Sequence, residues 1–403
     1  MNILVVCQYF YPEEFKVNDL VEGLVARGNK VTVLTGKPNY PKGVFFPGYR
    51  FAGVQREEYK GADVIRVPLI RRGNSGAVRL ALNYLSFVFF GNWYVRLHKC
   101  DYDAILVYQL SPIVMAYPAI LAKRKSHAKL ALYVQDLWPE SVSATTSFKG
   151  GILMNLLNRM VKKIYSKSDT IFVQSLAFTE SIGAKGDYID KIEYAPNWAE
   201  DVFVDKVEKE SFKHQDLLPD GFRVMFAGNI GEAQDFNSII NAASLTRDYK
   251  EIKWVIVGDG RAKEKSEQRV KEENLQDTVC FLGRFPVNEM PGFFLNADAM
   301  LVSLKKEFIF SLTIPSKVQA YMASGKPILS MIDGEGKRIV EESACGLTAS
   351  AEDYSALANN VLEMYRMTKE NLQEMGKRGL RYYKENFAKE MVINRIASSL
   401  GKK

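Results

Sequence analysis

The sequence predicts an α/β protein made of two doubly wound domains, each built around a parallel β-sheet. Short apolar runs such as Ile3–Cys7 and Ala104–Tyr108 have the length and composition of buried parallel strands. Stretches with helical spacing alternate with these runs, which is the repeating pattern of βαβ units. The pattern stops at a charged segment and starts again at Phe222, and a chain of 403 residues has room for two such domains.

Composition and net charge argue against several classes of protein. Lysine and arginine exceed the acidic residues by 54 to 47, and the net charge of +7 is too small to suggest a nucleic-acid binder. It fits a protein that works near phosphates or an anionic membrane surface. The chain is expected to lack a signal peptide, because Ile3–Cys7 is an apolar run of only five residues with no basic leader. It is expected to lack a membrane span, because no apolar run reaches about 18 residues. Four widely spaced cysteines favour a reduced, cytoplasmic protein over a disulfide framework or a zinc site: Cys7, Cys100, Cys280 and Cys345.

The first βαβ unit contains the strands Ile3–Cys7 and Lys30–Thr35, with a helix from about Asp19 to Arg27 between them. The loop after the first strand lies at the edge where doubly wound sheets bind ligands. It lacks the Gly-x-Gly-x-x-Gly fingerprint, so an ordinary dinucleotide site is not expected. Lys16 and Asn18 are candidate ligand contacts in this loop, and the alternative is a solvated loop.

The stretch Val78–Leu97 is apolar and aromatic around most of a helical wheel, and basic residues flank it on both sides. A surface helix that dips into an anionic leaflet has this pattern. A well-buried helix of a two-domain enzyme has it too, and both alternatives stay open. The polar and small residues within the stretch argue against a membrane span: Asn83, Ser86, Gly91 and Asn92.

Two carboxylates follow the predicted strand Lys129–Val134. Asp136 and Glu140 should therefore lie at the carboxyl edge of the first sheet, where this architecture does its chemistry. Asp136 is the stronger catalytic candidate, because Glu140 could instead only favour the start of a helix. The charged segment 199–221 contains no clear strand and is predicted to be the inter-domain linker.

Four loops of the second half should leave their sheet at one edge, and three of them are rich in glycine. Small residues let the backbone approach a ligand closely, so together these loops indicate a nucleotide site. The loops are Gly228–Gly231, Gly258–Arg261, Gly283–Arg284 and Thr313–Lys317.

The last of these loops runs into a predicted helix that begins at Pro315-Ser316 and ends at Gly325. The Ser316 hydroxyl is expected to cap the helix start by accepting from a backbone N–H. Such a helix start presents free N–H groups and a positive dipole end, and Lys317 adds a full charge. We therefore predict that a phosphate group binds here, and the alternative is an ordinary crossover of a parallel sheet.

Motifs spread over nearly the whole chain resemble the retaining nucleotide-sugar glycosyltransferases of family four, which have the two-domain GT-B architecture. The family motifs are Pro196-Asn197, Phe226–Asn229, Ile256–Gly260, Phe281–Gly283, Ala297–Ala299 and Ala320–Ile328. Other motifs resemble a subgroup of bacterial surface-polysaccharide transferases that acts in O-antigen, capsule or colanic acid assembly and includes N-acetylfucosaminyl transferases. These are Tyr11–Glu13, Asn18–Leu20, Leu34–Pro41, Gln135–Ser141 and Ile314–Lys317.

The resemblance implies an acceptor-binding domain at 1–200, joined by a last helix at about 386–403, and a nucleotide-sugar-binding domain at 201–385 across a cleft. It implies transfer of a sugar from a UDP-sugar to a polyprenyl-diphosphate-linked saccharide at the inner face of the cytoplasmic membrane, with no metal or other cofactor. The implied catalytic residues are Asp136, Lys317 and Glu140. The implied donor-binding residues are Lys16, Asn18, Gly228, Asn229, Gly231, Gln234, Arg261, Gly283, Arg284, Thr313, Pro315, Ser316 and Gln319.

The sequence departs from the family at charged positions. Ser311 and Gln319 stand where the family often has two glutamates, and Asn229 and Gln234 stand where it has two cationic phosphate ligands. Gln135 replaces the histidine of a His-Asp pair. The phosphate charge is then expected to be met, in order of preference, by Lys317, Arg261, Arg284 and Lys16.

Two other functions stay open. A UDP-sugar epimerase on the same fold would turn over a UDP-sugar without an acceptor. A non-catalytic binder of lipid-linked saccharides would bind the acceptor and release no UDP.

Overall fold

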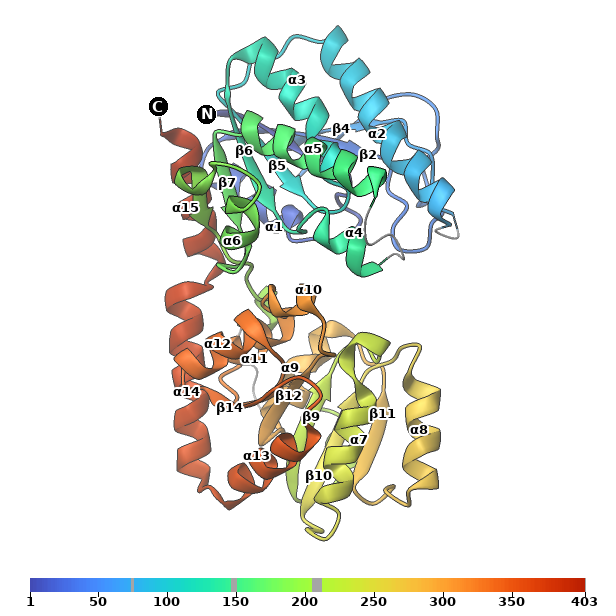
Figure 1. The fold of residues 1–403 in the computed structure, drawn as a ribbon, viewed down its shortest axis with the longest axis vertical. Coiled ribbons are helices and arrows are strands. Elements are labelled where there is room, and N and C mark those ends of the chain that lie inside the picture. Colours follow the sequence, from blue (N-terminus) through green and yellow to red (C-terminus); the bar gives the residue numbers. More distant parts are fainter. Residues whose placement is uncertain (74–75, 146–150, 205–211, 403) are drawn as a thin grey trace. The chain divides into compact units, whose positions relative to one another are not determined.

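The computed structural model describes residues 1–73, 76–145, 151–204 and 212–402, and the chain divides into two compact units (Figure 1). Unit 1 comprises Met1–Pro196 and Glu390–Lys403, and unit 2 comprises Asn197–Lys389. The segment 199–221, predicted to be the linker, therefore falls within unit 2. Its residues 205–211 lie outside the described part of the chain.

Unit 1 is organised around an eight-stranded sheet with the order β3-β4-β2-β1-β5-β6-β7-β8. All neighbouring strands are parallel except β3, which pairs antiparallel with β4. β3 was not predicted, because its sequence Gln-Arg-Glu-Glu-Tyr has no apolar run and resembles a polar loop. The strands are β1 (Asn2–Val6), β2 (Lys30–Gly36), β3 (Gln55–Tyr59), β4 (Ala62–Val67), β5 (Ala104–Gln109), β6 (Lys129–Val134), β7 (Thr170–Val173) and β8 (Ile192–Tyr194).

Helices connect these strands, and the last helix of the chain returns to the first one. Arg27, which follows α1, donates to Asn394 (2.6 Å) and pairs with Glu390 (2.6 Å), so the C-terminal helix α15 packs on α1 (Figure 1). The α-helices are α1 (Val17–Ala26), α2 (Ala77–Leu97), α3 (Tyr117–Ser126), α4 (Glu140–Thr145), α5 (Ile152–Lys167), α6 (Phe178–Gly183) and α15 (Lys389–Gly401). Two 3-10 turns complete the described part of the unit, η1 (Ile113–Ala116) and η2 (Ile189–Lys191).

Unit 2 contains a six-stranded, fully parallel sheet with the order β11-β10-β9-β12-β13-β14. Successive residues of β9 point to opposite faces, so Phe226 and Met225 belong to two separate hydrophobic cores. The strands are β9 (Phe222–Ala227), β10 (Ile252–Val257), β11 (Val279–Gly283), β12 (Ala299–Ser303), β13 (Ile328–Met331) and β14 (Gly346–Ala349).

The helices of unit 2 cover both faces of its sheet (Figure 1). They are α7 (Phe236–Leu245), α8 (Lys263–Glu272), α9 (Met290–Leu295), α10 (Phe308–Ser311), α11 (Ser316–Ala323), α12 (Gly334–Glu342), α13 (Tyr354–Arg366) and α14 (Lys369–Asn386). Short 3-10 turns are η3 (Asp201–Phe203), η5 (Gln215–Leu217), η6 (Glu232–Gln234) and η7 (Val287–Glu289).

The strand orders locate the ligand edge of each unit. The chain winds outward in both directions from β1 and β5 in unit 1, and from β9 and β12 in unit 2. In doubly wound sheets, ligands bind outside the carboxyl ends of the strands at such a switch point. The predicted fold of two parallel-sheet domains is confirmed, and the loops after β9 and β12 are the first place to look for a site.

Candidate functional site

The glycine loops of unit 2 are joined by backbone hydrogen bonds at the carboxyl edge of its sheet. The Gly228 N–H donates to the Val257 carbonyl (2.8 Å), and the Gly258 N–H donates to the Gly283 carbonyl (2.7 Å). Gly258 has φ 153°, and a Cβ there would lie 1.8 Å from the Gly228 carbonyl oxygen, so only glycine fits. This part of the edge is therefore bare backbone that a ligand can approach closely.

Lys317, in the first turn of α11, lies against this backbone. Its Nζ is 4.9 Å from the centroid of the Phe226 ring. A Cβ on Gly228 would come within 3.0 Å of the same Nζ, so the absence of a side chain there makes room for the ammonium group. Burial lowers the pKa of Lys317 to about 8. Within the described residues the ammonium group has no carboxylate partner, so a cation without a counterion lies at the switch point between β9 and β12.

The start of α11 differs in one respect from the sequence prediction. Pro315 occupies the N-cap position, Ser316 is the first helical residue, and no side chain caps the helix. The predicted capping role of the Ser316 hydroxyl is therefore wrong, because the helix begins one residue earlier than the cap required. The first N–H groups of α11 remain for water or an anion. The predicted stop at Gly325 is confirmed, with φ 66°.

Asn229 and Gln234, the neutral side chains at the positions of the family's cationic ligands, lie next to Gly231 and contact each other. Asn229 Nδ2 lies 3.5 Å from Gln234 Oε1, which also accepts from the Gly231 N–H (3.1 Å). Arg261 and Arg284 are exposed at the ends of the second and third glycine loops. The four side chains line the same edge as Lys317, but Lys317 is the cation held against the backbone. Thr313, in the loop before α11, donates to the Phe310 carbonyl (3.3 Å).

Gln319 is buried rather than open to a ligand. It is 1% exposed, and its Nε2 donates to the Asn197 carbonyl (2.6 Å) within unit 2. Its Oε1 has no partner among the described residues. This arrangement favours a structural role for Gln319, and contact with a ribose stays a prediction.

In unit 1, Asp136 is a half-buried and oriented carboxylate at the carboxyl edge. Ser111, which follows β5, donates to one of its oxygens, and Ser141 donates to the other at 3.3 Å. Trp138 Nε1 in turn donates to Ser111 Oγ (2.9 Å). Asp136 thus lies near the switch point between β1 and β5, where a ligand of unit 1 is expected.

The other two candidates from the first loop and the β6 edge have internal partners. Glu140 begins α4 and pairs with Lys185, while Ser181 donates to it at 2.6 Å. The Asn18 side chain accepts from the Tyr11 N–H (3.0 Å) and donates to the Glu13 carbonyl (2.8 Å). Both arrangements favour the structural alternative. Lys16 occupies the N-cap position of α1, and its side chain does not cap the helix.

The sequence analysis missed a buried glutamate at this edge. Glu13 is 2% exposed and accepts from the N–H groups of Asn39 (2.8 Å), Tyr40 (2.7 Å) and Phe10 (3.1 Å). Burial raises the pKa of Glu13 to about 7, and the backbone N–H groups pull it back down. Its place in the Tyr11–Glu13 motif was noted, but a contact made through backbone groups 26 residues away leaves no local pattern.

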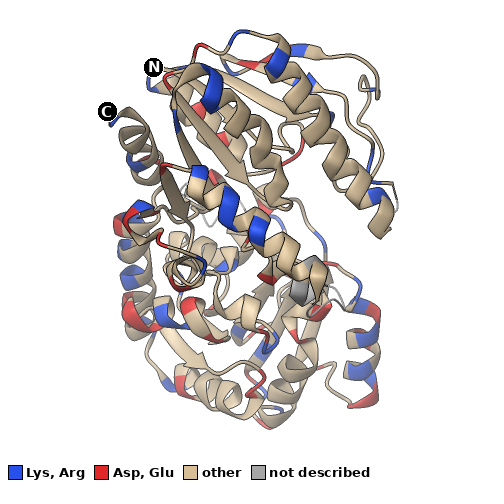
Figure 2. Ribbon diagram, turned by 45° about the horizontal axis from the view of Figure 1, so that its top comes forward, with Lys and Arg blue, Asp and Glu red and all other residues tan. Residues whose placement is uncertain are grey.

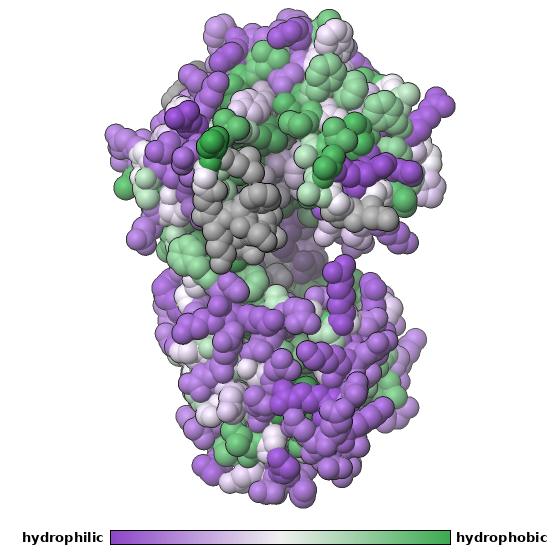
Figure 3. Space-filling view, turned by 45° about the vertical axis from the view of Figure 1, so that its right-hand side comes forward, coloured by the Kyte–Doolittle hydropathy of each residue, from purple (hydrophilic) through white to green (hydrophobic). Residues whose placement is uncertain are grey.

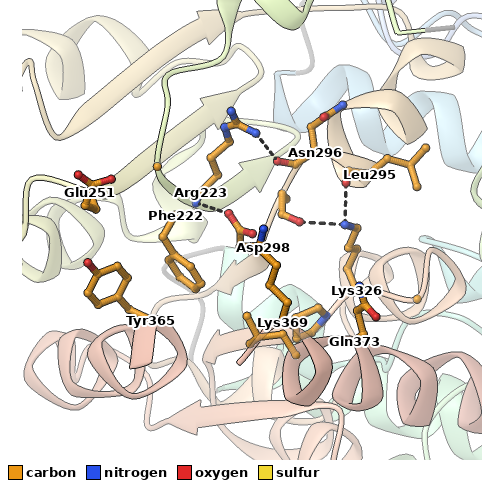
Figure 4. Close-up of a pocket in the computed structure, with 15 residues that line it drawn as sticks. Phe222, Arg223, Glu251, Leu295, Asn296, Asp298, Lys326, Tyr365, Lys369 and Gln373 are labelled. Atoms are coloured by element: carbon orange, nitrogen blue, oxygen red, sulfur yellow. Dashed lines mark hydrogen bonds between the residues drawn. The ribbon is translucent and has the colours of Figure 1, made fainter. Parts of the chain in front are cut away.

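A pocket of about 540 Å³ in unit 2 lies at the opposite edge of the sheet from Lys317, at the start of β9 (Figure 4). Two of its charged side chains have internal partners. Lys326 Nζ donates to the carbonyls of Leu295 (2.8 Å) and Ala297 (2.9 Å), and the Asp298 carboxylate accepts from the Arg223 N–H (2.8 Å). Among the residues that the structure describes, no group of three or more His, Cys, Asp and Glu side chains gathers as metal ligands would.

The helix α2 turns its apolar side outward. Its buried face combines the large residues Phe87, Tyr94 and Val95 with small and polar ones. Asn83 accepts from Gln8 (2.7 Å), and a Cβ on Gly91 would lie 2.8 Å from Pro118. The exposed face carries an apolar stripe at helical spacing, and Figure 3 shows hydrophobic surface on this unit. The stripe consists of Val78, Leu82, Leu85, Phe89, Trp93 and Leu97. The alternative of a fully buried helix is therefore wrong, because these side chains are in contact with solvent.

Part of this stripe forms one wall of a groove of about 670 Å³ between α2, α3 and α5. Basic side chains surround the groove, and α5 carries no acidic residue (Figure 2). The basic lining residues are Arg96, Arg124, Lys163 and Lys167. No helix in the described part of the chain is both long and apolar enough to span a bilayer.

Comparison with known proteins identifies the class. Residues 14–198 match the family model described as a glycosyl transferase 4-like domain, and residues 207–381 match the one described as glycosyl transferases group 1. The chain therefore joins a glycosyl transferase 4-like domain to a group 1 glycosyl transferase domain. The prediction of a glycosyltransferase is confirmed at this level.

Two individual relatives match most of the chain. WbjE of Pseudomonas aeruginosa, named as a glycosyltransferase, is 28% identical over 295 residues, or 71% of each chain. WcaI of Escherichia coli strain K12, named as a colanic acid biosynthesis glycosyl transferase, is 26% identical over 340 residues, which are 81% of this chain and 82% of WcaI. The chain is thus similar to transferases of bacterial polysaccharide biosynthesis.

Solved structures share the fold over the whole chain. HepE of Anabaena, solved with UDP and glucose, has a TM-score of 0.68 at 14% identity and covers 100% of both chains. WaaG, described as a glycosyltransferase involved in lipopolysaccharide biosynthesis, has a TM-score of 0.65 at 12% identity and also covers 100% of both chains. At such identities the likeness shows the fold alone, and that fold is the predicted GT-B architecture.

Proposed function

We propose that the protein is a retaining glycosyltransferase that moves a sugar from a UDP-sugar to a polyprenyl-diphosphate-linked saccharide during assembly of a bacterial surface polysaccharide. The observation that carries the proposal is the Lys317 ammonium group, which lies against Gly228 at the switch point of unit 2 and has no counterion in the part of the chain that the structure describes. The chemistry there suits a diphosphate that approaches bare backbone. N-acetylfucosamine is the candidate sugar suggested by the subgroup resemblance.

Lys317 and the start of α11 would stabilise the charge that develops on the leaving UDP. Preorganised donors act most strongly in a partly dry site, and burial of Lys317 against Phe226 provides one. The departing phosphate would accept the acceptor's proton on the same face of the sugar, so the reaction needs neither a side-chain nucleophile nor a metal ion. HepE, which shares the fold, was solved with UDP and glucose, and this supports UDP as the nucleotide.

The acceptor would bind unit 1, where Asp136 is held at the carboxyl edge by Ser111 and Ser141. An oriented carboxylate suits recognition of sugar hydroxyl groups, because it can accept two or more hydrogen bonds.

A lipid-linked acceptor would explain why the exposed apolar stripe of α2 and the adjoining basic groove occur together. We propose that this surface rests on the anionic inner face of the cytoplasmic membrane, because its apolar stripe adjoins a groove with four basic side chains. Apolar burial and attraction to anionic lipids would then act together.

Release of UDP from a panel of UDP-sugars, measured with and without a lipid-diphosphate-sugar acceptor, tests the proposed reaction. Acceptor-dependent release with one donor is expected. Conversion of the UDP-sugar without acceptor would indicate an epimerase instead, and acceptor binding without UDP release from any donor would indicate a non-catalytic binder.

Flotation with liposomes tests the membrane surface. The triple variant Phe89→Ala/Phe90→Ala/Trp93→Ala is expected to bind anionic liposomes at least about tenfold more weakly, because each large apolar side chain contributes roughly 1.5 to 3 kcal/mol when fully buried. Phe89 and Trp93 are 61% and 56% exposed, and the half-buried Phe90 packs on the exposed ring of Phe51, so none of the three belongs to the buried core. Undiminished liposome binding by the variant would exclude α2 as the contact.

A further inference from the structure

A group of side chains at the carboxyl edge of unit 1 takes no part in the proposed chemistry described so far. Tyr9 and Phe15 come from the loop after β1, Tyr40 from the loop after β2, Arg72 from the loop after β4, and Tyr84 from α2. We refer to these five residues as the aromatic–arginine cluster. The Tyr9, Phe15 and Tyr40 rings are in mutual contact, with centroid distances of 5.4 to 5.7 Å.

Arg72 is the unbalanced charge in the aromatic–arginine cluster. Its guanidinium carbon lies 5.1 Å from the centroid of the Tyr40 ring and 5.8 Å from that of Tyr9, and Nη1 donates to the Tyr9 hydroxyl (3.1 Å). Its Nε is buried without a hydrogen-bond partner, and no carboxylate of the described residues pairs with it. Arg66 on β4 differs, because it is 1% exposed and pairs with Glu57 at 2.9 Å. A half-buried cation that has no carboxylate partner among the described residues favours an anion from outside the chain.

The position of Arg72 is fixed in advance by the neighbouring loop. Its backbone N–H donates to Asn39 Oδ1 (2.9 Å), and the next N–H, of Gly73, donates to the Gly43 carbonyl (2.9 Å). Asn39 is itself fully buried and donates its N–H to Glu13 (2.8 Å). Because the framework is already ordered, binding an anion at Arg72 does not require ordering this loop.

The aromatic–arginine cluster adjoins the candidate acceptor residue Asp136 through Tyr84. Burial raises the pKa of the Tyr84 hydroxyl, Arg72 and the Tyr9 hydroxyl lower it, and Asp136 raises it. Tyr84 is thus within electrostatic reach of both a cation and a carboxylate. A ligand placed here would meet positive charge on one side and a sugar-binding carboxylate on the other.

We propose that the aromatic–arginine cluster binds the diphosphate ester of the acceptor, with the Arg72 guanidinium on the phosphate oxygens and Asp136 toward the sugar. The planar fork of an arginine matches two phosphate oxygens, which a lysine cannot reproduce. The exposed ring of Tyr40, at 38%, offers an apolar face to the ester carbon next to the phosphate. This inference rests on the proposed function, since it assigns the acceptor end of the same reaction.

Calorimetric titration of the full chain with farnesyl diphosphate, in saturating UDP to occupy the donor site, tests the proposal directly. Arg72→Ala is expected to weaken binding at least tenfold, and Arg72→Lys should restore only part of it. Arg71→Ala is the matched control, because it removes the same charge from an exposed neighbour and should change the affinity less than twofold. Farnesol should not bind measurably, whereas inorganic diphosphate should bind and lose affinity in the Arg72→Ala variant.

The outcomes separate this inference from the proposed function. Equal farnesyl diphosphate binding by wild type and Arg72→Ala, equal losses in Arg71→Ala, or no binding by wild type would each overturn the assignment of Arg72. The affinity for UDP, measured without other ligands, is expected to be the same in all variants, which shows that they are folded. In turnover, Arg72→Ala should raise KM for the acceptor and leave KM for the donor unchanged. Absence of UDP release in wild type would refute the transferase and leave the binding result standing.

Discussion

The carboxyl edges of the two sheets occupy the same topological position but are built from different groups. In unit 2 the edge consists largely of glycine backbone, and Lys317 lies on it with no carboxylate partner among the described residues. In unit 1 the edge consists of buried side chains that hold one another: Glu13 accepts from three backbone N–H groups, and Ser111 orients Asp136. Backbone and one cation suit a diphosphate that comes very close, whereas fixed polar side chains suit a ligand that is recognised by its hydroxyl groups and its ester.

The two edges should therefore respond differently to mutation. Function at the unit 2 edge should depend on one charge, because its glycines contribute only space and N–H groups. The unit 1 edge should depend on the framework that holds its loops together, so that changes there alter stability as well as binding.

The largest effect is expected from removing Lys317, the cation that lies against the glycine backbone of unit 2. Lys317→Ala should lower kcat/KM for the donor roughly 100- to 1,000-fold, or by about 3 to 4 kcal/mol, as the loss of one preorganised electrostatic donor does in other active sites. The fold should persist, because removing a desolvated charge relieves a cost of burial. Steady-state UDP release measures the effect, and thermal unfolding measures the fold.

Lys305→Ala is the matched control for Lys317. Lys305 lies at the same edge, just after β12, but it already pairs with Glu232 at 3.4 Å. Its loss should change kcat/KM less than about threefold, since an exposed ion pair contributes little. A comparable loss in both variants would show that general positive charge matters, and the contrast between the two edges would fail.

The next largest effect concerns the buried framework of unit 1. The pKa of Glu13 is about 7 in the folded chain and 4.5 in its ordinary state. Between these two pH values the folded chain holds more protons than the unfolded chain, so stability falls as pH rises, by about 3 kcal/mol in all. Glu13→Gln should remove this part of the pH dependence. Urea unfolding at pH 5 and pH 8 measures how the free energy of unfolding changes with pH in the wild type and in Glu13→Gln.

Glu14→Gln serves as the control for Glu13, because Glu14 is exposed and adjacent. It should leave the pH dependence as in the wild type. The informative quantity is the difference between pH 5 and pH 8 and not the absolute stability, since a glutamine amide facing backbone N–H groups costs the same at both values. An unchanged slope in Glu13→Gln would mean that the framework of unit 1 does not depend on this carboxyl.

The strands and glycine loops could be predicted from sequence because their signals are local. Runs of apolar residues such as Lys129–Val134 match the structure at both ends, and Gly258 marks a turn that only glycine can make. The position of Lys317 at this edge could also be predicted, because the order of strands and helices places the start of its helix at the carboxyl end of a parallel strand. β3 was missed, since this polar edge strand, with three consecutive charged residues, lacks the apolar run of a buried strand.

The partners of individual polar side chains could not be predicted. Gln319 holds the Asn197 carbonyl 122 residues away, and Glu140 is paired with Lys185. Such contacts depend on how distant segments meet, and no spacing in the sequence encodes them. The same holds for α2, whose composition fits both a buried helix and a surface helix. Which face it buries, with Asn83 and Gly91 on that face, depends on contacts with distant segments.

The smallest expected effect tests whether Lys317 acts through its positive charge. Because the pKa of Lys317 is about 8, kcat/KM for the donor should fall above pH 8 by about tenfold per pH unit as the ammonium loses its proton. Lys317→Arg should be slower overall but show no such fall up to pH 10, because a guanidinium stays charged. The same lowered pKa means that between pH 8 and 10.5 the unfolded chain holds the extra proton, so this group makes the folded wild type more stable as activity declines. A fall in activity together with a fall in stability, or an identical profile in Lys317→Arg, would assign the alkaline limb to another group.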